Sequence, residues 1–142
     1  MNPEDRYTVG DFMTRDLVEV TPGTTAINCA QVMQAERVSS AVVIEGGRLA
    51  GIITEKDLAR KIVAKGLDPQ KVMVREIMTA APFTVDPETT LYDAMLNLSK
   101  RKIKHLPVVR GNVPLGIITA MDILKVQPAL MEILGKPREP EQ

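Results

Sequence analysis

A four-residue pattern, Thr-x-x-Asp, occurs twice in the chain and presents a hydroxyl and a carboxylate at the same spacing. The copies run from Thr54 to Asp57 and from Thr119 to Asp122. At the start of a helix, the threonine hydroxyl accepts from the backbone N–H three residues on, while the carboxylate accepts from the N–H of the threonine. One copy alone favours this capping role over ligand binding, because helix caps are more common than ligand sites.

Few other residues have the chemistry of a catalytic or metal site. Lys104 and His105 could neutralise a phosphate, although lysines near a helix end more often interact with the helix dipole. Cys29 lies among apolar neighbours, which indicates a packed thiol, and one cysteine with one histidine cannot form a typical zinc site. Neither a glycine-rich phosphate loop nor a nucleophile elbow is present in the sequence. We therefore expect no enzyme, no cofactor and no metal.

The amino-acid composition limits which partners the protein can bind and which cellular compartment it is expected in. The 18 basic and 18 acidic side chains cancel, and aromatic residues make up 3% of 142 residues, which argues against nucleic-acid binding. A single cysteine gives no internal disulfide. The acidic start lacks the apolar run of a signal peptide, and no stretch is long enough to span a membrane. We expect a cytoplasmic protein with no membrane association.

The elements that must position the two Thr-x-x-Asp patterns belong to an internal repeat. Shifting the chain by 65 residues aligns Met13-Thr14 with Met78-Thr79, and Gly51-Ile52-Ile53-Thr54 with Gly116-Ile117-Ile118-Thr119. Several Val, Pro and Gly positions match between these motifs without a gap, and Asp57 matches Asp122 after them. A register kept over some fifty positions indicates two copies of one unit.

Each copy predicts the element order β-α-β-β-α. Short strands are expected at 17–20 and 83–85, each followed by a proline that stops the ladder, and then a helix capped by a threonine pair. Hairpins are expected for 41–44 with 49–53, through Gly46-Gly47, and for 106–109 with 115–118, through Gly111-Asn112. Thr54 and Thr119 begin the last helices, and the first of these should bury Leu58, Ile62 and Val63 on one side.

This pattern predicts an α/β (α+β) fold of two small domains that pack together. The domains span residues 7–66 and 74–128, joined by a linker at 67–73, and residues 129–142 form a short helical turn and a polar tail. A unit of this size buries too little surface to be stable on its own. We therefore expect the two copies to pack with pseudo-twofold symmetry and to form two related clefts.

The ordered and duplicated motifs resemble the cystathionine β-synthase (CBS) domain, and a tandem pair resembles a Bateman module. The resemblance covers residues 7 to 128, and it rests on Met-Thr before a strand and on Gly-Ile-Ile-Thr-x-x-Asp before a helix. It implies a regulatory pair that binds adenosyl compounds, such as AMP, ADP, ATP or S-adenosylmethionine, in clefts between the repeats. It also implies assembly into homodimers.

The resemblance implies roles for particular residues. Asp57 and Asp122 would accept hydrogen bonds from ribose hydroxyls, while Thr54 and Thr119 would face ribose or phosphate. One cleft would combine Asp122 with Lys104, His105, Val38 and the Thr14 region, and the other would combine Asp57 with Ser39, Ser40, Ile103 and the Thr79 region. The full set of expected ligand-binding residues is Thr14, Val38, Ser39, Ser40, Ile52, Thr54, Asp57, Thr79, Ile103, Lys104, His105, Ile117, Thr119 and Asp122.

Three classes of function are compatible with these residues. The first is an adenine-nucleotide sensor that controls a partner or a fused domain through a ligand-dependent change in packing. The second is a structural dimerisation module with degenerate sites. The third, a small enzyme acting on the nucleotide, is the least favoured, because no pair of base and nucleophile is visible in the sequence. The sequence does not identify the ligand or the regulated process.

Overall fold

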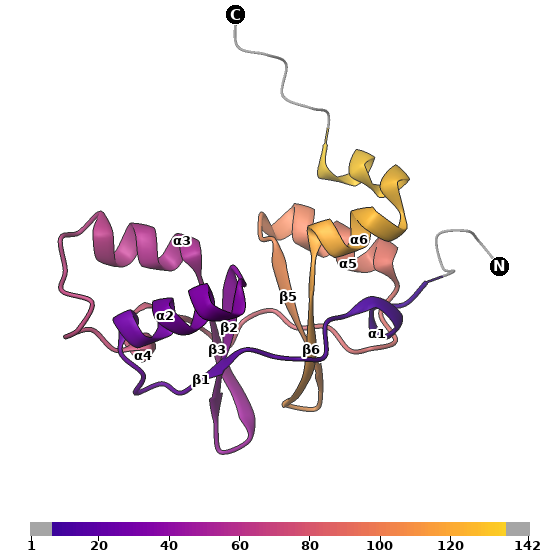
Figure 1. The fold of residues 1–142 in the computed structure, drawn as a ribbon. Coiled ribbons are helices and arrows are strands. Elements are labelled where there is room, and N and C mark those ends of the chain that lie inside the picture. Colours follow the sequence, from indigo (N-terminus) through magenta and orange to yellow (C-terminus); the bar gives the residue numbers. More distant parts are fainter. Residues whose placement is uncertain (1–6, 136–142) are drawn as a thin grey trace, which may run out of the picture. The chain divides into compact units, whose positions relative to one another are not determined.

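A computed structural model describes residues 7–135 of the chain, and it divides them into two compact units (Figure 1). The first-repeat unit contains Asp16–Phe83 and the hairpin tip Gly111–Pro114. The second-repeat unit contains the segment up to Arg15, Thr84–Arg110 and the chain from Leu115 onward. Each unit is a mixed α and β structure, as the sequence predicts.

The first-repeat unit is built on a four-stranded sheet in the order β1-β2-β3-β4. The strands are β1 (Glu19–Val20), β2 (Ser40–Glu45), β3 (Arg48–Thr54) and β4 (Thr79–Ala80). β1 is parallel to β2, and the other neighbours are antiparallel. The β2–β3 hairpin turns at Gly46 and Gly47, both with positive φ, which glycine adopts without steric cost.

Four helical segments complete this unit. They are α2 (Ala26–Glu36), α3 (Glu55–Leu58), its continuation as a π-helical turn η2 (Ala59–Val63), and α4 (Val74–Ile77). Together with the sheet they enclose one apolar core, largely of small and β-branched side chains, formed by Val20, Ala26, Cys29, Met33, Ala41, Val43, Ile53, Ile62, Val74 and Ile77.

The second-repeat unit repeats this plan with a two-stranded sheet. Its elements are α1 (Val9–Phe12), α5 (Leu91–Arg101), β5 (His105–Arg110), β6 (Val113–Thr119), α6 (Ala120–Val126) and a 3-10 helix η3 (Pro128–Leu134). Single bridges from Thr14 to Ile117 and from Val85 to Val108 flank the hairpin where the other unit has full strands. Leu91, Met95, Leu98, Leu106, Ile118 and Ile123 are completely or almost completely buried.

Most predicted elements are present, and two details were wrong. The strand expected at 83–85 is reduced to the bridge at Val85, because the chain pairs there at one position only. Val63 is 76% exposed, although it was expected beside the buried Ile62. The cause is the π-turn, in which the N–H of Ala64 donates to the carbonyl of Ala59, five residues back, and this wider turn changes the direction of the side chains that follow.

The compact units exchange a segment with respect to the sequence repeats. The N–H of Val9 donates to Thr89 O at 2.8 Å, and at the equivalent place 65 residues on, the N–H of Val74 donates to Thr24 O at 2.8 Å. The segment that precedes each repeat therefore packs on the other repeat. Residues 67–73, predicted as a linker, lie in the first-repeat unit, where Val72 O accepts from the N–H of Ala26 at the start of α2.

Candidate functional site

Both Thr-x-x-Asp patterns form capping boxes. The N–H of Thr54 donates to Asp57 Oδ2 at 2.9 Å, and the N–H of Asp57 donates to Thr54 Oγ1 at 3.3 Å. The equivalent bonds between Thr119 and Asp122 are 3.0 and 3.1 Å. The capping interpretation is thus confirmed in both copies. It leaves acceptor capacity on each carboxylate, because an ionised carboxylate offers about four lone-pair positions.

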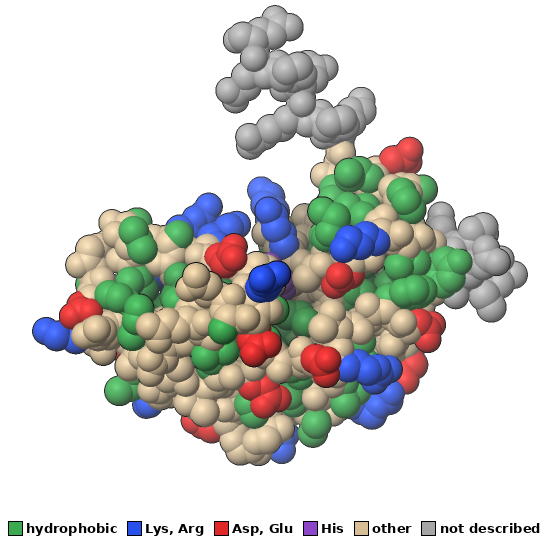
Figure 2. Space-filling model, viewed as in Figure 1, with side chains coloured by type: hydrophobic (Ala, Val, Ile, Leu, Met, Phe, Trp, Pro, Cys, Tyr) green, Lys and Arg blue, Asp and Glu red, His purple; other side chains and the backbone are tan. Residues whose placement is uncertain are grey.

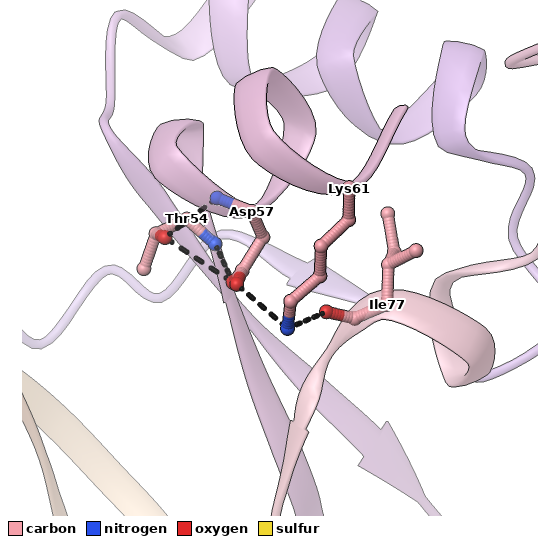
Figure 3. Close-up of polar contacts among 4 residues, drawn as sticks. All are labelled: Thr54, Asp57, Lys61 and Ile77. Atoms are coloured by element: carbon pink, nitrogen blue, oxygen red, sulfur yellow. Dashed lines mark hydrogen bonds and ion pairs between the residues drawn. The ribbon is translucent and has the colours of Figure 1, made fainter. Parts of the chain in front are cut away.

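The two carboxylates differ in what occupies the oxygen that the cap leaves open. Lys61 Nζ lies 3.1 Å from Asp57 Oδ1 and also donates to Ile77 O at 2.8 Å (Figure 3). The residue equivalent to Lys61 in the second repeat is Val126. Among residues 7–135, no lysine or arginine is found in an ion pair with Asp122.

The segment after the first helix of each repeat lies against its Thr-x-x-Asp pattern. The N–H of Glu55 donates to Ser39 O at 3.0 Å, and the N–H of Ala120 donates to Lys104 O at 3.1 Å. These bonds bring Ser39 and Ser40 to the Asp57 pattern, and Lys104 and His105 to the Asp122 pattern. Ser40 is buried, His105 is half-buried and Lys104 is exposed.

Thr14 and Thr79 also reach the patterns to which they were assigned. Thr79 pairs with Ile52 and Thr14 pairs with Ile117, two residues before Thr54 and Thr119 respectively. Val38 belongs to the first-repeat unit and Ile103 to the second-repeat unit, so neither is in the same unit as the pattern to which it was assigned. Their assignment, like the ligand-binding role of the whole set, stays a prediction.

Two glycines allow this close approach, and the sequence interpretation missed their role. A Cβ on Gly51 would lie 2.7 Å from both Met78 Sδ and Thr79 O, and a Cβ on Gly116 would lie 2.7 Å from Met13 Sδ and Thr14 O. Only glycine gives the Met-Thr segment room to pair with β3 or β6. The signal was present in the sequence, because Met-Thr and Gly-Ile-Ile-Thr recur at one common offset.

The second-repeat pattern lies beside a basic segment. Lys100, Arg101, Lys102 and Lys104 follow one another around the end of α5, whereas the equivalent first-repeat residues are Ala35, Glu36, Arg37 and Ser39. Figure 2 shows basic side chains over this end of α5. The helix ends in both repeats with a basic residue in the left-handed region, at φ 56 for Arg37 and 55 for Lys102. The two patterns therefore lie in different electrostatic surroundings.

Other chemistry is sparse in the part of the chain that the structure describes. Residues 7–135 contain no cluster of three or more His, Cys, Asp or Glu side chains that could hold a metal ion. Cys29 is completely buried, its thiol lies 3.8 Å from Met33 Sδ, and burial raises its pKa to about 11. A thiol so protonated is a poor nucleophile at neutral pH. Among the same residues, no helix combines the length and the apolar character needed to cross a membrane.

Comparison with known proteins identifies the family. The CBS domain model matches the chain twice, at residues 9–64 and 74–129, so the chain belongs to the CBS-domain family as a tandem pair. Tandem CBS pairs are typically regulatory rather than catalytic. An uncharacterized protein from Methanopyrus kandleri is 36% identical over 125 residues, which are 87% of this chain and 64% of that protein. This chain thus spans less than two thirds of that relative.

Two solved structures extend the comparison. CBSX2 in complex with AMP has a TM-score of 0.73 and 29% identity, covering 88% of this chain and 98% of CBSX2. The hexameric CBS-CP12 protein from bloom-forming cyanobacteria has a TM-score of 0.79 and 26% identity, covering 94% of this chain and 72% of that protein. The predicted tandem CBS fold is therefore confirmed.

Proposed function

We propose that this CBS pair is a sensor of adenosyl compounds, with Asp57 and Asp122 as the acceptors for ribose hydroxyls. The observation that carries the proposal is the assembly around each Thr-x-x-Asp pattern, where the carboxylate, the post-helix segment and the Met-Thr segment meet within one unit. The solved relative CBSX2 holds AMP. This kinship supports AMP, ADP, ATP or S-adenosylmethionine as the class of ligand.

The chemistry required is binding alone. A carboxylate accepts hydrogen bonds from vicinal hydroxyls, and such bonds to a charged acceptor contribute about 1.5–3 kcal/mol each. Backbone amides and carbonyls of residues 38–41 and 103–106 can read the edge of a base. Regulation follows if the ligand binds one packing arrangement of the chain more tightly than another, which shifts the population toward that arrangement. The output would reach a partner protein or a fused domain.

Phosphate recognition should distinguish the two patterns. Lys104 and its basic neighbours lie beside Asp122, whereas Ser39 and Ser40 lie beside Asp57. Charge-assisted hydrogen bonds are roughly twice as strong as neutral ones, so a phosphorylated ligand should fill the Asp122 site first. Titration calorimetry with AMP on the parent and on Lys104→Ala checks this. Two equal sites that ignore the substitution would contradict the assignment.

A thermal-shift panel of AMP, ADP, ATP, S-adenosylmethionine and NADH tests the proposed function directly. A ligand present at 100 times its Kd and bound only by the folded protein stabilises it by about 2.7 kcal/mol. We expect at least one adenosyl compound to raise the melting temperature. Flat melting curves at millimolar concentrations of all five would contradict the proposal.

A structural dimerisation module is the second candidate function. The observation in its favour is an exposed apolar residue on each of α2, η2, α5 and α6, together with a related protein that is hexameric. This function predicts stable self-association without saturable nucleotide binding. The thermal-shift panel and a mass measurement on the same sample therefore separate the two.

A further inference from the structure

Lys61 forms a contact that links three parts of the first-repeat unit. Its ammonium lies 3.1 Å from Asp57 Oδ1 and 2.8 Å from Ile77 O, the carbonyl at the end of α4 (Figure 3). The Lys61 side chain is 41% exposed and that of Asp57 is 13% exposed. An ion pair with one partly buried partner is screened less by salt than a fully exposed pair. The ammonium thus has two fixed acceptors.

This contact adds a third donor to the Asp57 carboxylate. Oδ2 already accepts from the N–H of Thr54 at 2.9 Å and from its hydroxyl at 3.2 Å. Oδ1 is the oxygen that the cap leaves open, and the Lys61 ammonium lies on it. A pair of ligand hydroxyls that approaches Oδ1 must therefore compete with a charged donor that the chain itself supplies, because one lone-pair position remains on that oxygen.

The second repeat is built without this competitor. Val126 occupies the place of Lys61, and Lys125, one residue earlier, is exposed. Among the residues that the structure describes, the one donor found on the Asp122 carboxylate is the N–H of Thr119, at 3.0 Å. The difference between the two carboxylates depends on one position, Lys61 in the first repeat and Val126 in the second. Substituting each residue by the other type therefore tests it directly.

We propose that Lys61 acts as an internal competitor that holds the Asp57 site closed, so that ligand fills the Asp122 site first. The inference rests on the proposed function and adds a specificity-determining residue to it. On phosphate attraction alone, adenosine would distinguish the two sites little; with Lys61 on Asp57, adenosine should also fill the Asp122 site first. When ligand displaces Lys61, the carbonyl of Ile77 loses its donor. Ile77 directly precedes in the sequence the Met78-Thr79 segment, which packs on Gly51.

The ligand-binding test compares Lys61→Met with Lys65→Met, which removes an exposed lysine of the same helical region. Adenosine is the main probe, because its binding does not depend on cation and phosphate attraction. In Lys61→Met, we expect affinity at the first-repeat site to increase about fivefold, the size of a modest ion pair. Lys65→Met should leave it unchanged. The reciprocal change Val126→Lys should weaken the Asp122 site by a similar factor.

The outcomes separate this inference from the proposed function. If adenosine or AMP binds the parent and Lys61→Met leaves both affinities unchanged, the inference is overturned and the proposed function stands. If neither probe binds the parent or Lys61→Met, the inference is overturned, and the thermal-shift panel decides separately whether the proposed function stands. In the double variant Lys61→Met and Asp57→Ala, the gain at the first site should disappear.

A measurement without ligand tests the contact itself. Lysine acetylation followed by mass spectrometry should modify Lys61 more slowly than Lys65 in the free protein, because the ammonium of Lys61 has two acceptors. Asp57→Asn should bring the Lys61 rate close to that of Lys65, and saturating adenosyl ligand should raise it as well. Equal rates for the two lysines in the free parent would overturn the inference whatever the ligand result.

Discussion

At the scale of single residues, the carboxylate of each Thr-x-x-Asp pattern caps a helix and, in the proposed function, also binds ligand. Asp122 caps α6 through the N–H of Thr119, and in the proposed function it also accepts from a ribose. An amide oxygen can replace the cap acceptor, but it cannot supply the charge that strengthens a bond to a hydroxyl. Substitutions that remove the charge and the cap separately can therefore assign each task.

We expect Asp122→Asn to lose affinity for adenosyl ligands while it keeps most of its stability. The loss of a charged acceptor should weaken binding by about 1.5–3 kcal/mol, whereas Asp122→Ala should also lose roughly 1 kcal/mol of folding free energy with the cap. Calorimetry and urea unfolding measure the two effects. Parent-like affinity in Asp122→Ala, together with earlier melting, would leave capping as its only task.

The buried thiol of Cys29 makes stability depend on alkaline pH. Burial raises the pKa of Cys29 from an ordinary value of 9.0 to about 11, so between these values the folded state binds more protons than the unfolded state. The free energy of unfolding should be almost unaffected by this group below pH 8 and should fall by about 1 kcal/mol between pH 8 and pH 10.

Urea unfolding of the parent and Cys29→Ala at pH 8 and pH 10 checks this. Lysines and tyrosines titrate in the same range, so the difference between the two proteins isolates the thiol. The variant should lose less stability than the parent over this interval. Equal losses in both would show that the thiol ionises as easily in the folded protein as in the unfolded one.

At the scale of elements, the hairpins and the helix starts were predictable because their signals are local. Gly46-Gly47 and Gly111-Asn112 set the turns, and threonine caps begin α2, α3, α5 and α6. The exposure of Val63 was not predictable from a regular helical spacing, because the π-turn changes that spacing. The bond from Lys61 to Ile77 O was not predictable for a different reason, because the two residues lie sixteen positions apart in the sequence.

The packing of each Met-Thr segment on the other repeat depends on one glycine. We expect Gly116→Ala to destabilise the protein by about 1–3 kcal/mol, because the new methyl group would lie 2.7 Å from Thr14 O, a backbone atom that cannot swing away. Chemical denaturation measures the loss. Gly23→Ala is the matched control, because its nearest neighbour is the flexible end of Arg75 at 3.3 Å. A loss no larger than that of the control would contradict this account.

At the scale of the whole molecule, apolar surface indicates self-association. Val32, Val63, Leu96 and Met121 are between 37% and 76% exposed, one on each of α2, η2, α5 and α6. Figure 2 also shows apolar side chains at the surface over η3, where Met131 and Leu134 are exposed. A contiguous exposed apolar patch is typical of a surface that a second chain covers, and we infer that these side chains contribute to one.

We therefore predict a homodimer. Light scattering at micromolar concentration should give twice the mass of one chain, because packing of these helices removes their apolar side chains from water. A charge placed at the most exposed position, Val63→Glu, should weaken the dimer if η2 is at the interface, and Val113→Glu, on β6, is the control away from the helices. A monomer mass for the parent would contradict the prediction.

The exchanged segments also bear on how such a chain could arise by duplication. Each unit is complete only with the leading segment of the other repeat, as the bonds from Val9 to Thr89 and from Val74 to Thr24 show. An ancestral chain with one repeat would have had to borrow that segment from a second copy. Association between separate chains would then have preceded gene fusion. After the duplication, the same packing would have formed between two repeats of one chain.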